Sequence, residues 1–319
     1  MNTQKYNLLA LFVLLCFAAC KTNDAFELET DSKAGAQIFI AKANRGTQNL
    51  TIFPYTDDAR EFTFGAGYGA LGLPANNISI KFSVDQKALD SINAIRLNSA
   101  LPPYEKFPAD AYQVGKLEVT IPKGGMSSDL VSIKYFSKKF SSDKSYCLPL
   151  TITDASGYTI SPMAKTIFIV APKLEEVPAT TTGWIATAST EQVTGESTGL
   201  ASALIDGNLA TIWHSRYSPL PRSSYPHWLN FDMLQPIYVT KVAIAARQNN
   251  ANGFTKFKLE GTLDGTNWIL LGDNLAFDPA VKSFQEYPIT RQYLRQIRAT
   301  LLEGKQDLTF MAEFTVYRY

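Results

Sequence analysis

The chain has 319 residues, of which 45% are hydrophobic, 18% charged and 12% aromatic. This composition is typical of a globular protein long enough for two domains, and it excludes a disordered chain, a collagen and a coiled coil. The charges nearly cancel, with 30 Lys and Arg against 29 Asp and Glu. Because a nucleic-acid binder needs an excess of basic residues to neutralise phosphates, we expect no nucleic-acid partner.

Residues 1–19 are predicted to be a lipoprotein signal peptide. Lys5 gives a basic start, and the apolar run from Leu8 to Phe17 is too short to span a bilayer. Residues 17–20, Phe-Ala-Ala-Cys, resemble a bacterial lipobox, although Phe17 stands where leucine is usual. The resemblance implies cleavage before Cys20 and lipidation of its thiol, which would anchor the protein to a membrane. An ordinary signal peptide cut nearby is the alternative.

The other two cysteines fit this interpretation. Cleavage removes Cys16, lipidation uses Cys20, and Cys147 is then left without a disulfide partner. Cys147 lies in a strand-like run, residues 145–152, and is interpreted as a small core residue rather than a nucleophile. Residues 20–33 are polar and are expected to form a tether.

Residues 34–171 show the alternation of half-buried strands. Ile78, Ile80, Phe82 and Val84 fall on one face, with polar residues between them. The same period recurs at residues 117–121 and 131–135, with Pro and Gly between the runs, which predicts a sandwich. Apolar residues near helical spacing predict one short helix within residues 84–97.

Four segments support a family resemblance for this half. They are residues 62–68 (FTFGAGY), 80–85 with 90–93 (IKFSVD and DSIN), 117–124 (LEVTIPKG) and 146–150 (YCLPL). On these, residues 34–171 resemble an immunoglobulin-like N-terminal domain of unknown function. That domain is common in surface lipoproteins of glycan-utilisation systems in gut Gram-negative bacteria. The resemblance implies a location and no catalytic residues.

Residues 172–183 are expected to be a linker, and 184–319 a second domain that holds all four Trp and both His. Four blocks of this domain, at residues 203–215, 227–232, 263–268 and 312–317, resemble the discoidin, or F5/8 type C, family in order and spacing. The resemblance implies an eight-stranded jelly-roll sandwich whose loops at one end bind ligand. The whole chain is therefore expected to be all-β.

The resemblance also implies a structural calcium ion. Asp206 and Glu313 would supply carboxylates, and Thr211 its hydroxyl. The family's remaining ligands are backbone carbonyls, which here belong to Ala203, Asn208, Thr211 and Ala312. Calcium favours such a set of oxygens around a tight turn. An Asx turn formed by Asp206 without metal is the alternative.

Three side chains are the candidate sugar ligands implied by the resemblance. His214 matches the histidine on the family's binding rim, and Arg247 and Asn252 match the Arg and Asn of galactose-type members. An imidazole, a guanidinium fork and an amide together can donate to and accept from sugar hydroxyls. A structural histidine, a salt-bridged strand end and a turn residue, respectively, are the alternatives.

A sugar also needs an aromatic platform for its C–H face. Tyr217 and Tyr225 are the first candidates because their loop follows His214, with Phe254 and Phe310 as alternatives. Glu196 is a further candidate ligand by its position before the calcium loop. His227 is expected to be a packing residue.

These features predict a non-catalytic, cell-surface glycan-binding lipoprotein of the outer membrane, with a periplasm-facing orientation left open. The expected partners are a galactose-type glycan, the membrane and surface glycan-uptake proteins. A protein- or membrane-adhesion module, or an accessory subunit without its own sugar site, is the alternative. No enzyme is expected, because the sequence lacks an HExxH motif and a phosphate-binding loop, and neither half resembles a glycosidase domain.

Overall fold

The computed structural model describes Lys33 and residues 35–196 and 198–319. The predicted signal peptide, Cys20 and all but the end of the predicted tether therefore lie outside the described residues. The chain divides into two compact units, Met1–Leu174 and Glu175–Tyr319, and each is described here by itself. Among the described helices, none combines the length and the apolar character needed to cross a membrane.

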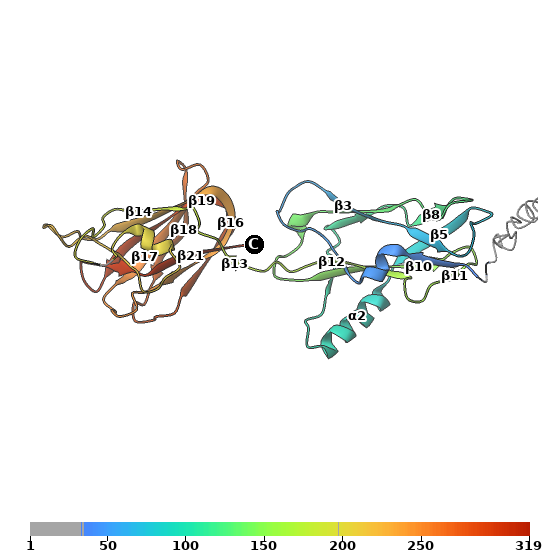
Figure 1. The fold of residues 1–319 in the computed structure, drawn as a ribbon, viewed down its shortest axis with the longest axis horizontal. Coiled ribbons are helices and arrows are strands. Elements are labelled where there is room, and N and C mark those ends of the chain that lie inside the picture. Colours follow the sequence, from blue (N-terminus) through green and yellow to red (C-terminus); the bar gives the residue numbers. More distant parts are fainter. Residues whose placement is uncertain (1–32, 34, 197) are drawn as a thin grey trace, which may run out of the picture. The chain divides into compact units, whose positions relative to one another are not determined.

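The first unit is built of short strands, with one helix at the side of them (Figure 1). Three sheets have the strand orders β11-β1-β4, β2-β12-β10-β5-β8 and β3-β9-β7. Their strands are β1 (Gln37–Ile40), β2 (Gln48–Asn49), β3 (Arg60–Phe64), β4 (Ala66–Gly69), β5 (Ile78–Val84), β6 (Glu105–Lys106), β7 (Tyr112–Val114), β8 (Glu118–Ile121), β9 (Val131–Tyr135), β10 (Tyr146–Asp154), β11 (Thr159–Ile160) and β12 (Thr166–Ala171).

Alternation predicts the buried faces of these strands well. Ile78, Ile80 and Phe82 of β5 are buried in the core, while the strand's last residue, Val84, is 41% exposed. The predicted helix is α2 (Gln86–Asn98), which begins where the Asp85 carboxylate accepts a hydrogen bond from the backbone N–H of Ala88 at 3.1 Å. Leu89 anchors the helix because it is buried with Cys147 and Val170.

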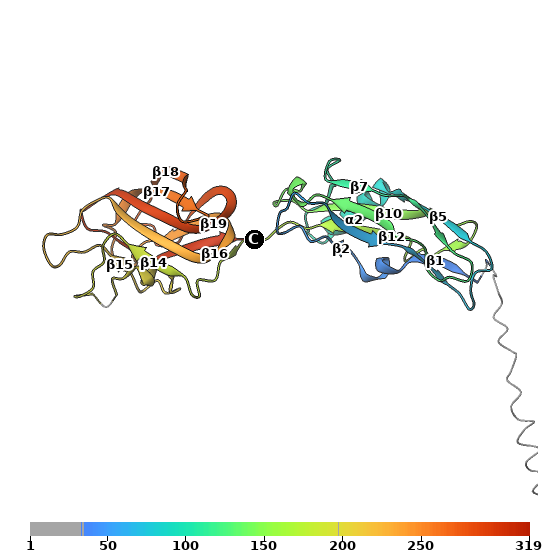
Figure 2. The same cartoon turned by 90° about the horizontal axis from the view of Figure 1, so that it is seen from above.

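The second unit is a β-sandwich whose main sheet is larger than any sheet of the first unit (Figure 2). Its main sheet has the order β13-β21-β16-β19-β17-β18, and β14 also pairs with β16. The strands are β13 (Val177–Pro178), β14 (Ile185–Ala188), β15 (Trp213–His214), β16 (His227–Ala245), β17 (Phe254–Thr262), β18 (Trp268–Ala276), β19 (Gln285–Gly304), β20 (Phe310–Met311) and β21 (Glu313–Arg318). Three short 3-10 helices complete the elements of the two units: η2 (Ala41–Arg45), η3 (Ser137–Lys139) and η4 (Ala201–Ile205).

Aromatic rings fill the core of this unit. Trp213 is fully buried, Phe231 stacks on Phe314 with ring centroids 3.9 Å apart, and Phe254 stacks on Phe277 at 4.2 Å. Part of the segment expected to be a linker belongs to this unit, since β13 pairs with the edge of β21. Among the described residues α2 is the one α-helix, and the predicted all-β fold is confirmed.

Candidate functional site

His214 lies on β15, paired with β20 through Phe310. Its Nδ1 atom is 2.6 Å from the carbonyl oxygen of Ser215. A carbonyl only accepts, so Nδ1 carries the proton and Nε2 is left as an acceptor. Burial is the main cause that lowers the pKa of His214, and the nearby Arg247 charge lowers it further, while Glu196 and the Ser215 carbonyl oppose the shift. His214 is therefore neutral near pH 7.

Arg247 and Glu196 line one hollow of about 280 Å³ in the second unit. The Arg247 guanidinium lies over the Phe310 ring, 5.0 Å from its centroid, and its Nε donates to Asn249 Oδ1 at 2.9 Å. The ring of Phe310 also packs against His214, with centroids 5.4 Å apart. The structure thus gathers a guanidinium, a carboxylate, an imidazole and an aromatic ring from segments far apart in the sequence.

Asn249 is a contributor that the sequence analysis missed. It lines the hollow together with Arg247, whereas Asn252 is exposed and is not among the lining residues. The Asn252 backbone N–H donates to Asn250 Oδ1 at 2.9 Å, which is the local bond of a turn former. Asn249, Asn250 and Asn252 all follow Arg247 closely in the sequence. Only the geometry of the turn determines which of them lines the hollow.

The two tyrosine candidates occupy different environments. Tyr217 meets His214 edge-on at 5.2 Å, and its hydroxyl reaches over Gly195, so it borders the site. Tyr225 instead packs against the core of the second unit and contacts His227 edge-on at 5.1 Å. Burial raises the pKa of Tyr225 to about 12. Tyr225 thus packs against the core of the second unit in this structure, and its platform role stays a prediction.

Lys282 holds the loop that carries Arg247. Its ammonium donates to the carbonyl oxygens of Arg247 and Asn250, both at 2.8 Å, and of Pro279 at 2.7 Å. Replacing Lys282 with Met is expected to weaken ligand binding at the Arg247 hollow several-fold and to lower the stability of the second unit by about 2 kcal/mol, because three carbonyls lose a charged donor. Titration calorimetry and thermal unfolding measure both effects.

The control for this prediction is Lys305→Met. Lys305 is an exposed lysine whose backbone N–H donates to the Gly253 carbonyl, so the substitution removes the same charge and leaves the contacts of Lys282 with the loop in place. A Lys282→Met protein that binds as tightly as the parent would show that the three carbonyl bonds do not position Arg247.

Gly199 fixes the position of His214. Its carbonyl accepts from the His214 N–H at 3.2 Å, and the His214 carbonyl accepts from the Gln192 N–H at 2.9 Å. A Cβ atom at Gly199 would lie 2.1 Å from the Gln192 carbonyl oxygen. The Gly199→Ala variant is therefore expected to lose about 2 kcal/mol of stability or more and to bind glycan more weakly. An unchanged Tm in calorimetry would contradict this.

The predicted calcium loop is held by its own side chains. Both Asp206 oxygens accept from the Thr211 hydroxyl, at 3.0 and 2.8 Å, and Oδ1 also accepts from the Asn208 N–H at 2.8 Å. Glu313, on β21, is buried beside this loop, and its Oε2 atom is buried without a hydrogen-bond partner. Among the described residues no group of three or more His, Cys, Asp or Glu side chains is placed to hold a metal.

The electrostatics of Glu313 fit a divalent cation. Burial, followed by the negative charge of Asp206, raises the pKa of Glu313 to about 7, although the backbone of Gly207 and Asn208 opposes the shift. A buried, unpartnered carboxylate oxygen facing a second carboxylate is costly unless a cation lies between them. Asp206, Glu313 and the neighbouring carbonyls therefore suit calcium, and two carboxylates are enough for a structural site.

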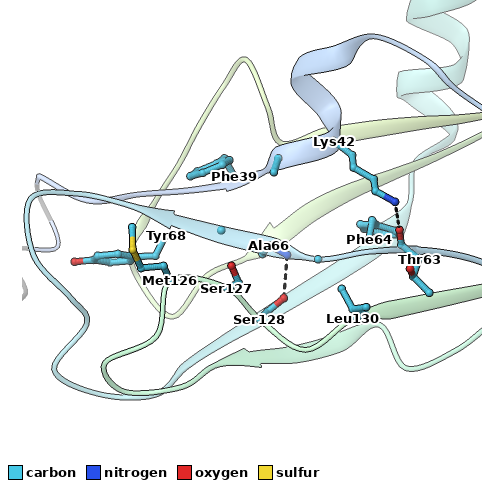
Figure 3. Close-up of a pocket in the computed structure, with 13 residues that line it drawn as sticks. Phe39, Lys42, Thr63, Phe64, Ala66, Tyr68, Met126, Ser127, Ser128 and Leu130 are labelled. Carbon is cyan, nitrogen blue, oxygen red and sulfur yellow. Dashed lines mark hydrogen bonds between the residues drawn. The ribbon is translucent and has the colours of Figure 1, made fainter.

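The first unit contains a larger hollow of about 580 Å³ (Figure 3). Phe39, Met126 and Leu130 are among its lining residues. Two of its polar side chains already have partners, because Lys42 donates to the Thr63 carbonyl at 2.6 Å and Ser128 accepts from the Ala66 N–H at 2.9 Å.

Cys147 shows no sign of reactivity. It is a free thiol buried with Leu89 and Val170, and burial raises the pKa of the Cys147 thiol to about 12. A thiol in this state is neutral and inert at physiological pH.

Comparison with protein families identifies the second unit. Residues 185–314 match the F5/8 type C domain, and residues 31–159 match a second family described as an N-terminal domain. Residues 185–314 of this chain thus match the F5/8 type C, or discoidin, domain over most of the second unit.

Two curated relatives share parts of the chain. A sialidase from Micromonospora viridifaciens is 33% identical over 76 residues, which is 24% of this chain and 12% of the relative. An A type blood N-acetyl-alpha-D-galactosamine deacetylase from Flavonifractor plautii is 31% identical over 137 residues, 42% of this chain and 17% of the relative. The chain spans less than a fifth of either protein.

Solved structures with some likeness include carbohydrate-binding modules. One, from Clostridium perfringens in complex with GalNAc-beta-1,3-galactose, is 25% identical with a TM-score of 0.41, covering 44% of this chain and 99% of that one. A family 32 module from the same organism, in complex with galactose, is 23% identical with a TM-score of 0.40, covering 45% of this chain and 100% of that one.

Proposed function

We propose that this protein is a non-catalytic glycan-binding protein that captures carbohydrate through its F5/8 type C domain. The observation that carries the proposal is the cluster at the 280 Å³ hollow, where Arg247 and Glu196 lie beside Phe310 and His214. Arg247 offers donors, Glu196 accepts, and the free Nε2 of neutral His214 accepts a further hydroxyl. Such a mixture suits the hydroxyl-rich edge of a sugar.

Galactose-type sugars are the class that we propose for this site. The family pattern at His214 and Arg247 supports this choice, and the name of the Flavonifractor relative specifies an N-acetylgalactosamine. One shallow site should bind weakly, with a Kd between tens of micromolar and millimolar, or about 4–6 kcal/mol. Tethering beside other binders would raise the effective affinity.

We further propose that calcium stabilises the loop beside this site. Asp206 and Glu313 would hold the ion with the Thr211 hydroxyl and the carbonyls of Ala203, Asn208, Thr211 and Ala312. When bound, the ion supplies positive charge between the two carboxylates. The support is the buried, unpartnered Oε2 of Glu313.

The cellular placement is also a proposal. A lipidated Cys20 would anchor the protein to the outer membrane, with residues 21–33 as a tether and surface glycan-uptake proteins as neighbours. The support is the sequence of residues 17–20 alone. Mass spectrometry of the membrane fraction tests it, since a Cys20→Ala variant should lose both the acyl mass and the membrane association.

A glycan-array screen tests the central proposal. The chain from Lys21 onward, with calcium present, should bind glycans that share one terminal galactose-type sugar, and His214→Ala should lose those hits. A silent array from folded, calcium-loaded protein would overturn the proposal and favour an adhesion or accessory role.

A further inference from the structure

The outer face of the main sheet in the second unit carries two tryptophans and an arginine. Arg298 lies on β19, and its guanidinium carbon is 4.1 Å from the ring centroid of Trp268 and 5.6 Å from that of Trp228. The three side chains come from β18, β19 and β16, so only the folded sheet brings them together. Trp228 is 38% exposed, and Leu270, next to Trp268 on the same face of β18, is 61% exposed.

Arg298 has donors that the protein does not use. Its Nε atom is buried without a hydrogen-bond partner, and no salt bridge joins Arg298 to a carboxylate of the described residues. The carboxylate opposite Arg298 in the sheet register belongs to Glu260, which pairs with Lys258 at 3.1 Å instead. The aromatic rings therefore hold the guanidinium while its fork stays unsatisfied.

An unused acceptor lies beside it. Asn230 is the register partner of Arg298 on β16, and its Oδ1 atom is also buried without a hydrogen-bond partner. Since buried polar atoms are nearly always bonded in folded proteins, two such atoms on neighbouring strands mark an incomplete polar site. The charges of Lys258 and Glu260 cancel each other. Lys258, Glu260 and Arg298 together therefore carry one net positive charge, which comes from Arg298.

We propose that this face is a second carbohydrate site, specific for an acidic sugar such as a uronate or a sialate. The carboxylate of the sugar would accept two parallel hydrogen bonds from the Arg298 fork, and the apolar face of the sugar ring would lie on Trp228 or Trp268. A neutral sugar would leave the guanidinium unpaired, so the site discriminates by charge.

The site is separate from the hollow at Arg247. Its residues lie on three strands of the sheet face, whereas Arg247, Glu196 and Asn249 lie in loops. A chain of acidic and galactose-type sugars could therefore be bound at two places by one domain. The sheet-face site requires neither the loop site nor calcium, and its test can succeed or fail independently of the proposed function.

Titration calorimetry and tryptophan fluorescence on the chain from Lys21 onward test the site. The probes are an oligogalacturonate, its methyl-esterified form and 3′-sialyllactose. We expect the acidic probes to bind and to quench tryptophan emission, with affinity falling as salt is raised, and the ester to bind at least about ten-fold more weakly. Arg298→Met, which keeps the contact with the rings, should weaken acidic binding about ten-fold or more.

Arg247→Ala is the matched control, because Arg247 is also an arginine stacked on a ring. It should leave binding of the acidic probes intact while it removes binding of neutral galactose-type sugars, and Arg298→Met should do the reverse. Arg298→Lys, which keeps the charge and loses the fork, should be intermediate. The proposal is overturned if folded protein ignores all acidic probes, or if their binding survives Arg298→Met and disappears in Arg247→Ala.

Discussion

Replacing Arg247 with alanine is expected to weaken binding of the galactose-type glycan about a hundred-fold. Arg247 offers charged donors at the hollow and covers Phe310, so truncation removes hydrogen bonds worth about 1.5–3 kcal/mol each and uncovers the ring. His214→Ala should have a similar effect through the lost Nε2 acceptor. Titration calorimetry with the best array hit measures both.

Arg222→Ala is the control for charge, because Arg222 is exposed and not part of the hollow. It should bind as the parent does, and the Arg222→Ala and Arg247→Ala proteins should unfold at nearly the same temperature as the parent, since neither Arg222 nor Arg247 is buried. Tight binding by Arg247→Ala would remove the main support for the loop site.

Binding of the galactose-type glycan should weaken as the pH is lowered into the acid range. Burial lowers the pKa of His214 below its ordinary 6.5, so the neutral form with a free Nε2 predominates above that pH. Affinity should stay level from about pH 6.5 to 8 and fall in acid, where protonation of Nε2 removes the acceptor. The His214→Ala protein should lack this acid limb.

Calcium is expected to stabilise the second unit strongly at pH 8 and weakly at pH 5. In the metal-free protein the pKa of Glu313 is raised from 4.5 to about 7. A carboxyl with a raised native pKa favours the folded state at low pH, and that contribution is lost as pH rises through about 7. Metal-free protein should therefore lose up to about 3 kcal/mol between pH 4.5 and 8. Thermal unfolding with and without chelator measures the difference.

Glu313→Gln separates the metal from the charge. The amide cannot ionise, so without metal this variant should be more stable than the parent at pH 8 and should not respond to calcium. Asp264→Asn is the control, because Asp264 closes a similar turn through Thr266 and Asn267 and should leave the calcium response intact. If chelation at pH 8 leaves the Tm of the parent unchanged, the calcium proposal is wrong.

The local sequence predicted the strands. It did not predict burial at positions where contacts with other segments of the chain determine it. The alternation at Ile78, Ile80 and Phe82 identified the core face of β5, because each apolar side chain of a half-buried strand faces the same layer. Trp213 and His214 are consecutive residues of the extended strand β15, so their side chains point to opposite sides. Both are buried, because β15 is covered by Phe310 and Tyr217 as well as by the main core.

The candidate site was predicted in part. His214, Arg247 and Glu196 came from motif positions, and the structure places them near one another. Asp206 and Glu313, which also came from motif positions, lie near each other. As ligands or platform, the sequence ranked Tyr225 above Phe310 and did not name Asn249. The direction in which a loop residue points depends on turns and packing, and sequence spacing does not encode either.

The sequence by itself determined that the chain is all-β and that its second half is an F5/8 type C domain, because strand alternation and family motifs are local patterns. Only the tertiary structure decided that Arg298 lies between Trp228 and Trp268 with Asn230 beside it, or that the Glu313 carboxylate is buried against Asp206. These groups meet through strand register and the closing of loops across the sandwich, which depend on the whole core and not on any one segment.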